Sequence, residues 1–305
     1  MKLFAVLLLL LLGMFSLSET EVVHSFKQDC PQFFIKIKNK KVPPTVLEGK
    51  QYKQICQFYE GEYRFATLYD TIHRIPVYSA YTYTITENRG IDYNDWMIEP
   101  QLDEPWTNNN REMRRERVIP GQVQGWADGN VEEEQIWKQA LKKDYSGTFL
   151  NERYTKGHVF PKSYAQGDQQ KESTFTLTNV APQTEDSNRQ WADKVEKPML
   201  KEIKENCKDT AYIVTGVIPG ETWLPIERRG ETIVQGVNIP RHFWTAYSCK
   251  SNNNINVSNA YFSQQITQPP YGKTEFKVKN MTIDTLNKKL ETYYYKTPFL
   301  FLVFG

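Results

Sequence analysis

Residues 153–196 read RYTKGHVFPKSYAQGDQQKESTFTLTNVAPQTEDSNRQWADKVE and contain three polar side chains of different chemistry, His158, Asn188 and Glu196. An apolar alternating run and a proline-containing turn at 181–183 separate the histidine from the other two. With 29 residues between His158 and Asn188 and seven between Asn188 and Glu196, the three side chains cannot share one amphipathic surface. The stretch therefore predicts a site assembled from two strands and a helix.

The residue types suit hydrolysis of a phosphodiester bond. That reaction needs a base to deprotonate water, a divalent cation on the phosphate oxygens and a positive charge near phosphorus. His158 is a suitable base because imidazole titrates near neutral pH, and Lys156 is a suitable positive charge. Mg²⁺ prefers oxygen ligands and retains several waters, so the amide oxygen of Asn188 can be its sole direct protein ligand. Glu196 would then hold a metal-bound water, and Gly157 would let Lys156 and His158 both face the substrate.

These motifs resemble the DNA/RNA non-specific endonucleases of the ββα-metal (His-metal finger) type, and most closely their secreted vertebrate relatives, the endonuclease domain-containing 1-like proteins. The family pattern is Arg-Gly-His, then Asn-x-x-x-Gln with proline before the glutamine, then Asn and Glu. The matching residues here are Lys156-Gly157-His158, Asn179 to Gln183, Asn188 and Glu196. The first asparagine precedes the second by nine residues and the glutamate follows eight further on, as in the family.

The resemblance implies a role for each residue. His158 would be the general base, Asn188 the ligand of Mg²⁺ or of another divalent cation such as Mn²⁺, and Glu196 the residue that orients a metal-bound water. Asn179 would support the site. The family also implies cleavage of DNA and RNA through contacts with the phosphate backbone, with little sequence preference and with 5′-phosphate and 3′-hydroxyl products.

A second function stays open at this stage, namely a secreted protein that binds nucleic acid or another surface on the same fold with weakened catalysis. It rests on four departures from the bacterial members of the family. Lys156 replaces Arg and so lacks a bidentate donor. Thr155 replaces Asp, Leu200 replaces Arg, and Asn94 lies where those members have a substrate-facing Arg. Taken singly, the motif residues also have ordinary explanations as a surface histidine, turn or cap asparagines and a solvated glutamate.

The chain begins MKLFAVLLLLLLGMFSLS, which predicts a secretory signal peptide over residues 1–18. The remaining residues, 19–305, are expected to form one endonuclease-like domain, because no linker, repeat or low-complexity tract divides them. A formal net charge of +2 excludes generalised electrostatic attraction to nucleic acid, so phosphate contacts must come from a local cluster. The segment REMRRER at 111–117 is one candidate, and a solvated charged face is the alternative. The sequence does not indicate an oligomeric state.

Four cysteines in an exported chain predict two disulfides, and of the three pairings we expect Cys30–Cys56 and Cys207–Cys249 from their proximity along the chain. Sequons at Asn256 and Asn280 fit a glycosylated extracellular surface. The short apolar tail at 297–305 is expected to be a core strand or docking segment, so no membrane partner is expected.

The expected fold is α+β, with a central, mostly antiparallel sheet that carries the ββα-metal finger on one face. In this finger one strand holds His158, a second strand ends near Asn179, and a helix carries Asn188 and Glu196. Residues 63–85 predict a hairpin with its turn at 70–74, residues 211–216 predict a buried strand, and 237–247 predict another strand entered at Pro240. A helix is expected after Thr184, capped by Asp186 or Ser187 and interrupted at Pro198. Its apolar stripe is made of residues at every fourth position, Trp191, Val195, Met199 and Ile203.

Overall fold

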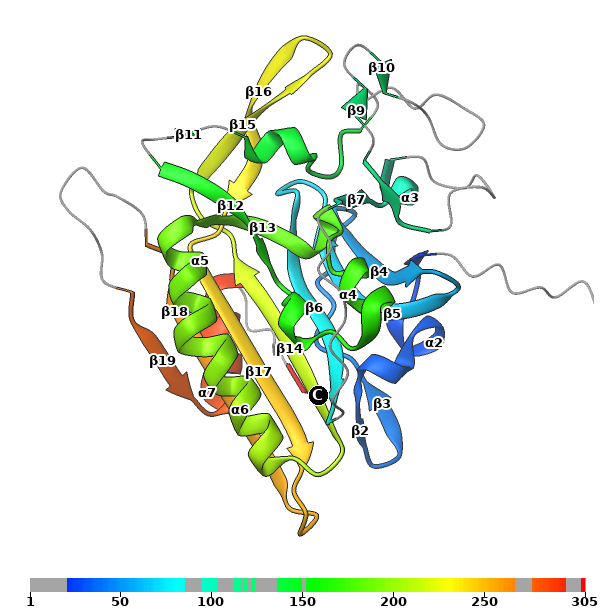
Figure 1. Ribbon diagram of the computed structural model, residues 1–305, viewed down its shortest axis with the longest axis vertical. Helices are drawn as coiled ribbons and strands as arrows, with labels where there is room; N and C mark the ends of the chain where they lie inside the picture. The colour runs from blue at the N-terminus through cyan, green and yellow to red at the C-terminus, as the bar shows by residue number, and fades with distance from the viewer. Residues whose placement is uncertain are drawn as a thin grey trace, which may run out of the picture.

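The computed structural model describes residues 21–85, 95–103, 112–116, 118–119, 122–123, 136–146, 148–149, 152–266, 276–294 and 303–304. The predicted signal peptide and Asn94 therefore lie outside the described residues. The fold is α+β, and its largest feature is an eight-stranded antiparallel sheet in the order β1-β4-β5-β6-β14-β17-β18-β19 (Figure 1). These strands are β1 (Val22–Val23), β4 (Tyr52–Tyr59), β5 (Glu62–Asp70), β6 (Ile75–Thr84), β14 (Thr210–Ile218), β17 (His242–Lys250), β18 (Asn256–Gln264) and β19 (Val278–Met281).

The predicted hairpin is present as β5 and β6, which are rich in aromatic and β-branched residues and suit a pleated surface with buried faces. Its turn is tightened by Arg74, which has a left-handed φ of 55°. The predicted buried strand is β14, which pairs with β6 on one side and β17 on the other. The expectation of a single strand across 237–247 is wrong. Pro240 lies between two strands of different sheets, because it cannot donate a ladder hydrogen bond.

Smaller sheets and short helices surround the main sheet. The two-stranded sheets pair β2 (Ile35–Ile37) with β3 (Lys40–Val42), β7 (Met97–Ile98) with β8 (Arg114–Arg115), β9 (Val118–Ile119) with β10 (Gln122–Val123), and β15 (Thr222–Arg228) with β16 (Glu231–Ile239). The helices outside the motif segment are α2 (Phe26–Asp29), α3 (Pro100–Asp103) and α7 (Ile283–Tyr294), with 3₁₀ turns η1 (Pro31–Phe33) and η3 (Lys142–Tyr145).

The motif segment forms the expected ββα unit, but its second strand lies later than predicted. β12 (Glu152–His158) pairs antiparallel with β13 (Val180–Thr184), and β11 (Thr148–Phe149) completes the three-stranded sheet. Between β12 and β13 lie η4 (Lys162–Tyr164), α4 (Gly167–Ser173) and η5 (Leu177–Asn179). The predicted turn at 181–183 is instead β13, an edge strand, where the missing N–H of Pro182 is tolerated.

The helix after the ββ pair begins at α5 (Glu185–Trp191), passes through the π-helical turn η6 (Ala192–Glu196) and continues as α6 (Lys197–Asn206). Thr184 caps it by accepting a hydrogen bond from the Ser187 backbone N–H, so the predicted caps Asp186 and Ser187 are wrong by two or three positions. The expected interruption is the π turn just before Pro198, which has no N–H to donate. All four residues of the predicted apolar stripe are buried.

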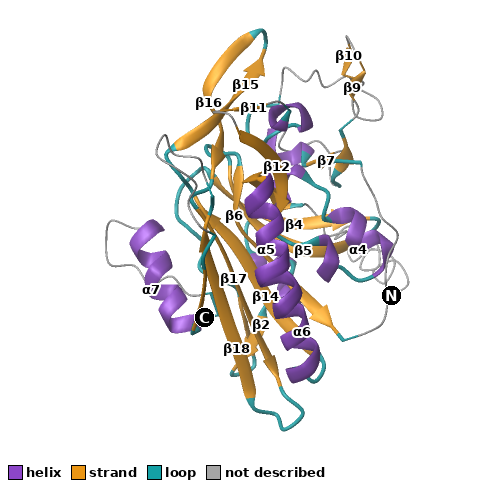
Figure 2. Ribbon diagram, turned by 60° about the vertical axis from the view of Figure 1, so that its left-hand side comes forward, coloured by secondary structure: helices purple, strands orange, loops and turns teal. Residues whose placement is uncertain are grey.

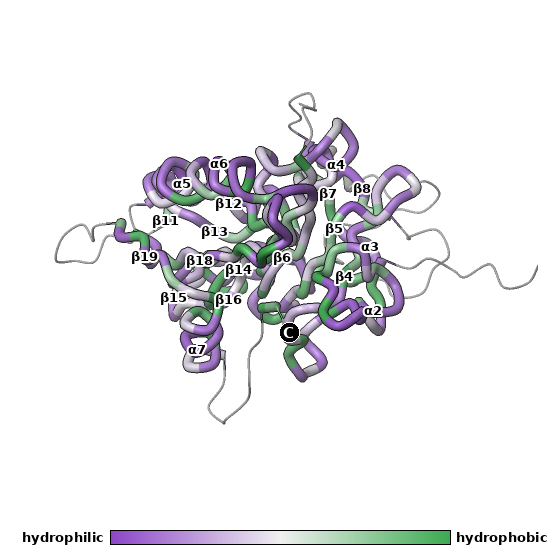
Figure 3. The backbone as a smooth tube through the Cα atoms, turned by 90° about the horizontal axis from the view of Figure 1, so that it is seen from below, coloured by the Kyte–Doolittle hydropathy of each residue, from purple (hydrophilic) through white to green (hydrophobic). Residues whose placement is uncertain are grey.

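The main sheet lies between two layers of helix. Figure 2 shows α5 and α6 along one face and α7 on the other. Two separate apolar clusters correspond to these faces, with Trp191 and Val195 in the first and Leu286 and Leu290 in the second. Seen from below, apolar segments gather along β6 and β14, and both helical layers turn polar residues outward (Figure 3). Both predicted disulfides, Cys30–Cys56 and Cys207–Cys249, are confirmed.

Candidate active site

His158 ends β12 and is enclosed by aromatic rings. Its imidazole lies 4.9 Å from the Phe175 ring in an edge-on arrangement and 5.4 Å from the Trp96 ring, centroid to centroid. Trp96 and Phe175 also contact each other at 5.3 Å. Phe175 precedes η5 and Trp96 precedes β7, and the Met97 N–H donates a hydrogen bond to the Phe175 carbonyl. The histidine is therefore oriented by segments that are far apart in the sequence.

The surroundings of His158 favour its neutral form and leave one nitrogen free. A hydrogen bond between the ring and the Lys156 backbone carbonyl occupies one nitrogen, whereas Nε2 is buried and has no hydrogen-bond partner among the described residues. Burial, with the nearby charges of Lys162 and Lys156, lowers the pKa of His158 to about 4. The imidazole is therefore neutral over most of the pH range, with Nε2 able to accept a proton.

Lys156 lies on the same strand and contacts the same aromatic group. Its ammonium is 5.1 Å from the Trp96 ring centroid and 5.4 Å from that of Tyr145. Burial and the positive charge of Lys142 lower the pKa of Lys156, and Glu116 partly offsets this. A half-buried cation held over two rings is partly desolvated, which strengthens its attraction to an anion.

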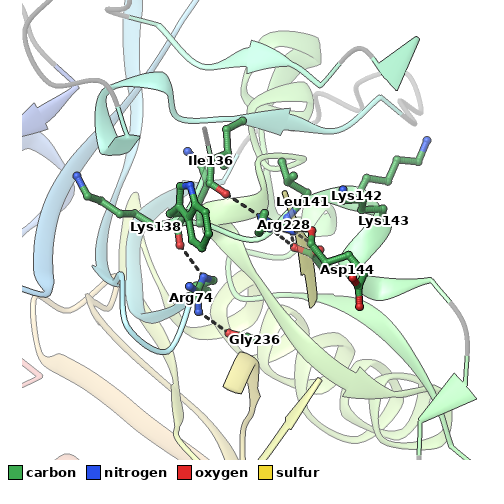
Figure 4. Close-up of polar contacts among 12 residues, drawn as sticks. Arg74, Ile136, Lys138, Leu141, Lys142, Lys143, Asp144, Arg228 and Gly236 are labelled. Carbon is green, nitrogen blue, oxygen red and sulfur yellow. Dashed lines mark hydrogen bonds and ion pairs between the residues drawn. The ribbon is translucent and has the colours of Figure 1, made fainter. Parts of the chain in front are cut away.

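A buried ion pair fixes the turn that supplies Tyr145. Arg228, from the end of β15, donates from Nη1 and Nη2 to the two carboxylate oxygens of Asp144 at 2.8 and 2.6 Å, and from Nε to the Ile136 carbonyl at 2.7 Å. Both charged side chains are 1% exposed or less. Figure 4 shows the contacts of Arg228 with Asp144 and Ile136, and separately the hydrogen bond from Arg74 to the Gly236 carbonyl. The turn η3 is therefore anchored to the hairpin β15–β16.

Asn179 is fully buried, and all of its hydrogen-bonding capacity is used. Its Oδ1 accepts from the Phe160 N–H and the Ser79 hydroxyl, each at 2.9 Å. Its Nδ2 donates to the carbonyls of Phe160 at 3.1 Å and Thr174 at 3.0 Å. The side chain therefore ties the segment after His158 to β6 and to the segment before Phe175.

Asn188, in the second turn of α5, is positioned by Thr155. The Thr155 hydroxyl donates to the Gln183 carbonyl at 2.9 Å, so it can only accept from the Asn188 Nδ2, which lies 2.9 Å away. This fixes the orientation of the amide and leaves the Asn188 Oδ1 without a hydrogen bond to any described residue. A fixed, half-buried and unpartnered amide oxygen is a suitable ligand for a hard cation.

Glu196 ends the π turn and retains some exposure. Burial of its carboxyl group raises the pKa to about 8, and the neighbouring Lys197 offsets this only in part. Its backbone carbonyl accepts a hydrogen bond from the Tyr164 hydroxyl at 2.7 Å, which fixes the helix at this point. A carboxyl group with so high a pKa is typical of a functional site.

The structure joins these residues into two groups. His158 and Lys156 share the aromatic group of Trp96, Phe175 and Tyr145, and Asn188 is joined to Thr155 on the same strand. No hydrogen bond or ring contact links the side chains of His158, Asn188 and Glu196 to one another. Among the residues the structure describes, no three His, Cys, Asp or Glu side chains gather into a metal site. Any cation in the motif region would therefore depend on amide oxygen and water, as Asn188 allows.

The remaining candidate residues have other environments. Leu200 belongs to α6, is half-buried and packs against the core, so no substrate contact is assigned to it. Of the segment 111–117, Arg115 pairs with Glu172 at 3.1 Å and Asp95 at 3.6 Å, while Arg111 and Arg117 lie outside the described residues. The pairing of Arg115 favours a structural role over phosphate contact there.

Sequence reasoning did not assign the aromatic group or the Asp144–Arg228 pair to the site. Trp96 and His158 are 62 positions apart, and Asp144 and Arg228 are 84 apart. Contacts over such separations leave no local periodicity. The one local signal is the segment Trp-Met-Ile-Glu-Pro at 96–100, which supplies the tryptophan.

Comparisons with known proteins agree with this architecture. The model of the family described as DNA/RNA non-specific endonuclease matches residues 49–298. The chain is 31% identical over 223 residues to the human endonuclease domain-containing 1 protein and 30% identical over 223 residues to the mouse protein, which covers 72% of this chain in each case. It spans only 39% and 38% of the length of those relatives.

A solved structure titled as the EndoG/EndoGI complex, on the mechanism of EndoG inhibition, is similar over 78% of this chain and 84% of that chain. The TM-score is 0.45 at 15% identity, a likeness too low to support conclusions about this chain. The family match covers most of the sequence, including every motif residue of the ββα unit. The chain therefore belongs to the DNA/RNA non-specific endonuclease family.

Proposed function

We propose that this protein is a secreted, metal-dependent endonuclease that hydrolyses phosphodiester bonds of DNA and RNA with little sequence preference. The observation that carries the proposal is the state of His158, a neutral imidazole with a buried and unpartnered Nε2, placed beside a cation within the family motif. Backbone phosphates are common to all sequences, so a site that contacts them has no means of selecting bases.

Each motif side chain has a task in this mechanism. Nε2 of His158 accepts a proton from the attacking water, because its other nitrogen is bonded to the Lys156 carbonyl. The Lys156 ammonium attracts the phosphate as negative charge builds on its oxygens. Asn188 Oδ1 would hold Mg²⁺ or Mn²⁺, and Glu196 would orient a water on that ion. A cation held by Asn188 would supply Lewis acidity for the reaction.

Cleavage should remain active in moderately acidic solution. A general base must be unprotonated, and the pKa of His158 is lowered to about 4, so its base form is lost only as the pH falls through that value. The acid limb that His158 contributes to the cleavage rate at saturating Mg²⁺ is therefore expected well below pH 6.5.

A pH series on short duplexes under single-turnover conditions measures this limb. Glu196→Gln is the control, because the raised pKa of Glu196, about 8, can produce a separate limb that the amide removes. An acid limb near 6.5 that persists in Glu196→Gln would contradict the proposed state of His158.

Variants of Lys156 test whether this lysine stabilises the negative charge that develops on the phosphate. Lys156→Ala should lower turnover on the order of 10²-fold, because it removes a preorganised positive charge. Lys156→Arg should retain or raise activity, since guanidinium stacks on Trp96 and Tyr145 and adds a bidentate donor. The initial rate at which each variant cleaves circular DNA measures these effects. Full activity in Lys156→Ala would show that another cation has this role.

The proposal is tested by incubating purified protein with plasmid DNA and with RNA, with Mg²⁺ or Mn²⁺ and with a chelator. Degradation of both substrates only with the cation, giving 5′-phosphate ends, is expected. If the protein binds nucleic acid but does not cut it with any divalent cation, the proposed nuclease function would give way to the alternative, a binding protein with weakened catalysis. Lys156 in place of Arg and Leu200 in place of Arg are the observations that favour this alternative.

Export is part of the proposal and rests on the apolar leader together with the two disulfides. Both sequon asparagines, Asn256 and Asn280, are exposed and so available for glycosylation. None of the helices in the described part of the chain is long and apolar enough to cross a membrane.

A further inference from the structure

Two fully buried carboxyl groups that the proposed mechanism does not use, those of Glu21 and Glu99, lie next to each other. Glu21 lies directly before β1, and Glu99 lies directly before α3. The two side chains are close enough to share a hydrogen bond, and each has an oxygen, Oε2, that accepts no hydrogen bond from another described group. Glu21 is held in place by its backbone, since its N–H donates to Gln101 Oε1 at 2.9 Å and its carbonyl accepts from the Cys56 N–H at 2.8 Å.

The hydroxyl groups beside Glu99 determine the orientation of a third buried side chain, that of Gln57. Thr178 Oγ1 donates its one proton to Glu99 Oε1 at 3.1 Å, and Thr176 Oγ1 donates to the same oxygen at 2.7 Å. Thr178 can therefore only accept from Gln57, whose Nε2 lies 2.9 Å away. This leaves Gln57 Oε1, also fully buried, without a donor.

The cluster contains acceptor oxygens and carries no compensating positive charge. Burial raises the pKa of Glu21 well above its usual range, and the charges that add to this effect are those of Glu99 and Glu112. The pKa of Glu99 is also raised by burial, and its contacts with Glu21, Thr176 and Thr178 lower it in part. No lysine or arginine acts on either carboxyl group among these influences. Two ionised carboxylates could not stay buried here without a counter-charge.

A shared proton would satisfy the two carboxyl groups but would leave Gln57 Oε1 unpartnered. A cation bound between the two carboxyl groups and reached by the Gln57 amide would satisfy all three oxygens, and hard cations bind carboxylate, amide and hydroxyl oxygen. We propose that Glu21, Glu99 and Gln57, with the Thr176 and Thr178 hydroxyls alongside, form a structural site for a hard cation, with Ca²⁺ as the preferred ion. Ca²⁺ fits better than Mg²⁺ because it accepts flexible protein coordination, whereas Mg²⁺ usually retains several waters, which a fully buried site has little room to hold.

The site would join three parts of the chain that are distant in sequence. Glu21 belongs to the segment that enters β1, and Gln57 belongs to β4. Thr176 directly precedes η5 and Thr178 lies within it, between Phe175 and Asn179. A bound cation would therefore couple the N-terminal strand to the segment that orients His158. The proposal does not depend on nuclease activity, and its test uses binding and stability only.

The test measures Ca²⁺ content and thermal stability of the purified protein. After exhaustive dialysis against metal-free buffer, elemental analysis is expected to find about one equivalent of Ca²⁺ per chain. Protein with intact disulfides is refolded from denaturant either in chelator or in Ca²⁺ at roughly a hundredfold excess over its Kd. The protein refolded in Ca²⁺ should melt about 5–10 °C higher.

Two variants test whether the bound Ca²⁺ and the shift in melting temperature come from this cluster. Glu21→Gln should lose both the bound Ca²⁺ and the melting shift yet still fold, because its amide can donate to Glu99 in place of a shared proton. Glu231→Gln, at an exposed carboxylate on β16, should behave like the wild type. A wild-type protein with no bound Ca²⁺ and no melting shift would overturn the proposal and leave a proton shared by Glu21 and Glu99. Equal Ca²⁺ binding by Glu21→Gln would also overturn it.

Discussion

His158→Ala is expected to lower turnover on the order of 10²–10⁴-fold, the range for loss of a general base. In the proposed mechanism the imidazole contributes only Nε2 and forms no bond to the cation, so affinity for Mg²⁺ should stay close to that of the wild type. The variant should also remain folded. His158 makes aromatic contacts with Trp96 and Phe175, but those two rings still contact each other at 5.3 Å without it.

Single-turnover cleavage of a labelled duplex, with calorimetric titration of Mg²⁺, measures both quantities. His73→Ala is a matched control, because that histidine is half-buried in the β5–β6 turn, where it pairs with Asp70 at 2.7 Å and stacks on Trp223. Its loss should leave cleavage near the wild-type rate. If His158→Ala cleaves within a few-fold of the wild type, His158 is not the base and its free nitrogen has another purpose.

Arg228→Met is expected to lower the free energy of unfolding by about 3–5 kcal/mol. The variant removes the guanidinium and leaves the Asp144 carboxylate, 1% exposed, without its bidentate partner. The remaining hydrogen bond from the Leu141 N–H, at 2.7 Å, cannot replace a full positive charge. Because η3 carries Tyr145, the same variant should also weaken the placement of Lys156.

Guanidinium denaturation of the variant and the wild type measures this loss. Lys201→Met is the control, because its ion pair with Glu205 has side chains 76% and 58% exposed and should contribute less than about 1 kcal/mol. The double variant Arg228→Met with Asp144→Leu should recover much of the loss, since it removes the unpaired charge. A loss below about 1 kcal/mol in Arg228→Met would show that water reaches Asp144.

Local patterns in the sequence were sufficient for several elements. The alternation and turn residues of 63–85 predicted the β5–β6 hairpin, and the four-residue spacing from Trp191 to Ile203 predicted the buried face of α5–α6. The proximity of the cysteines along the chain was sufficient to predict the pairing of both disulfides. Each of these depends on interactions between residues that are near in sequence or share one element.

The second strand of the ββα unit was misplaced for a physical reason. Phe175, Leu177 and Asn179 alternate as a strand would, but the Asn179 side chain satisfies the backbone groups of Phe160 and Thr174 and so holds the segment as a 3₁₀ turn. Pro182 is typical of a turn, yet an edge strand tolerates it. Such tertiary contacts override local propensity and cannot be read from spacing.

The dependence of the cleavage rate on Mg²⁺ concentration, compared between the wild type and Asn188→Ala, tests the central claim most directly. The claim is that one fixed amide oxygen, positioned by Thr155, holds the cation that cleavage requires. Saturable, chelator-sensitive cleavage by the wild type is predicted, with a rate in Asn188→Ala that is lower by at least about 10²-fold and does not saturate over the same Mg²⁺ range. Cleavage that is independent of Mg²⁺, or the same saturation curve in Asn188→Ala, would contradict the account.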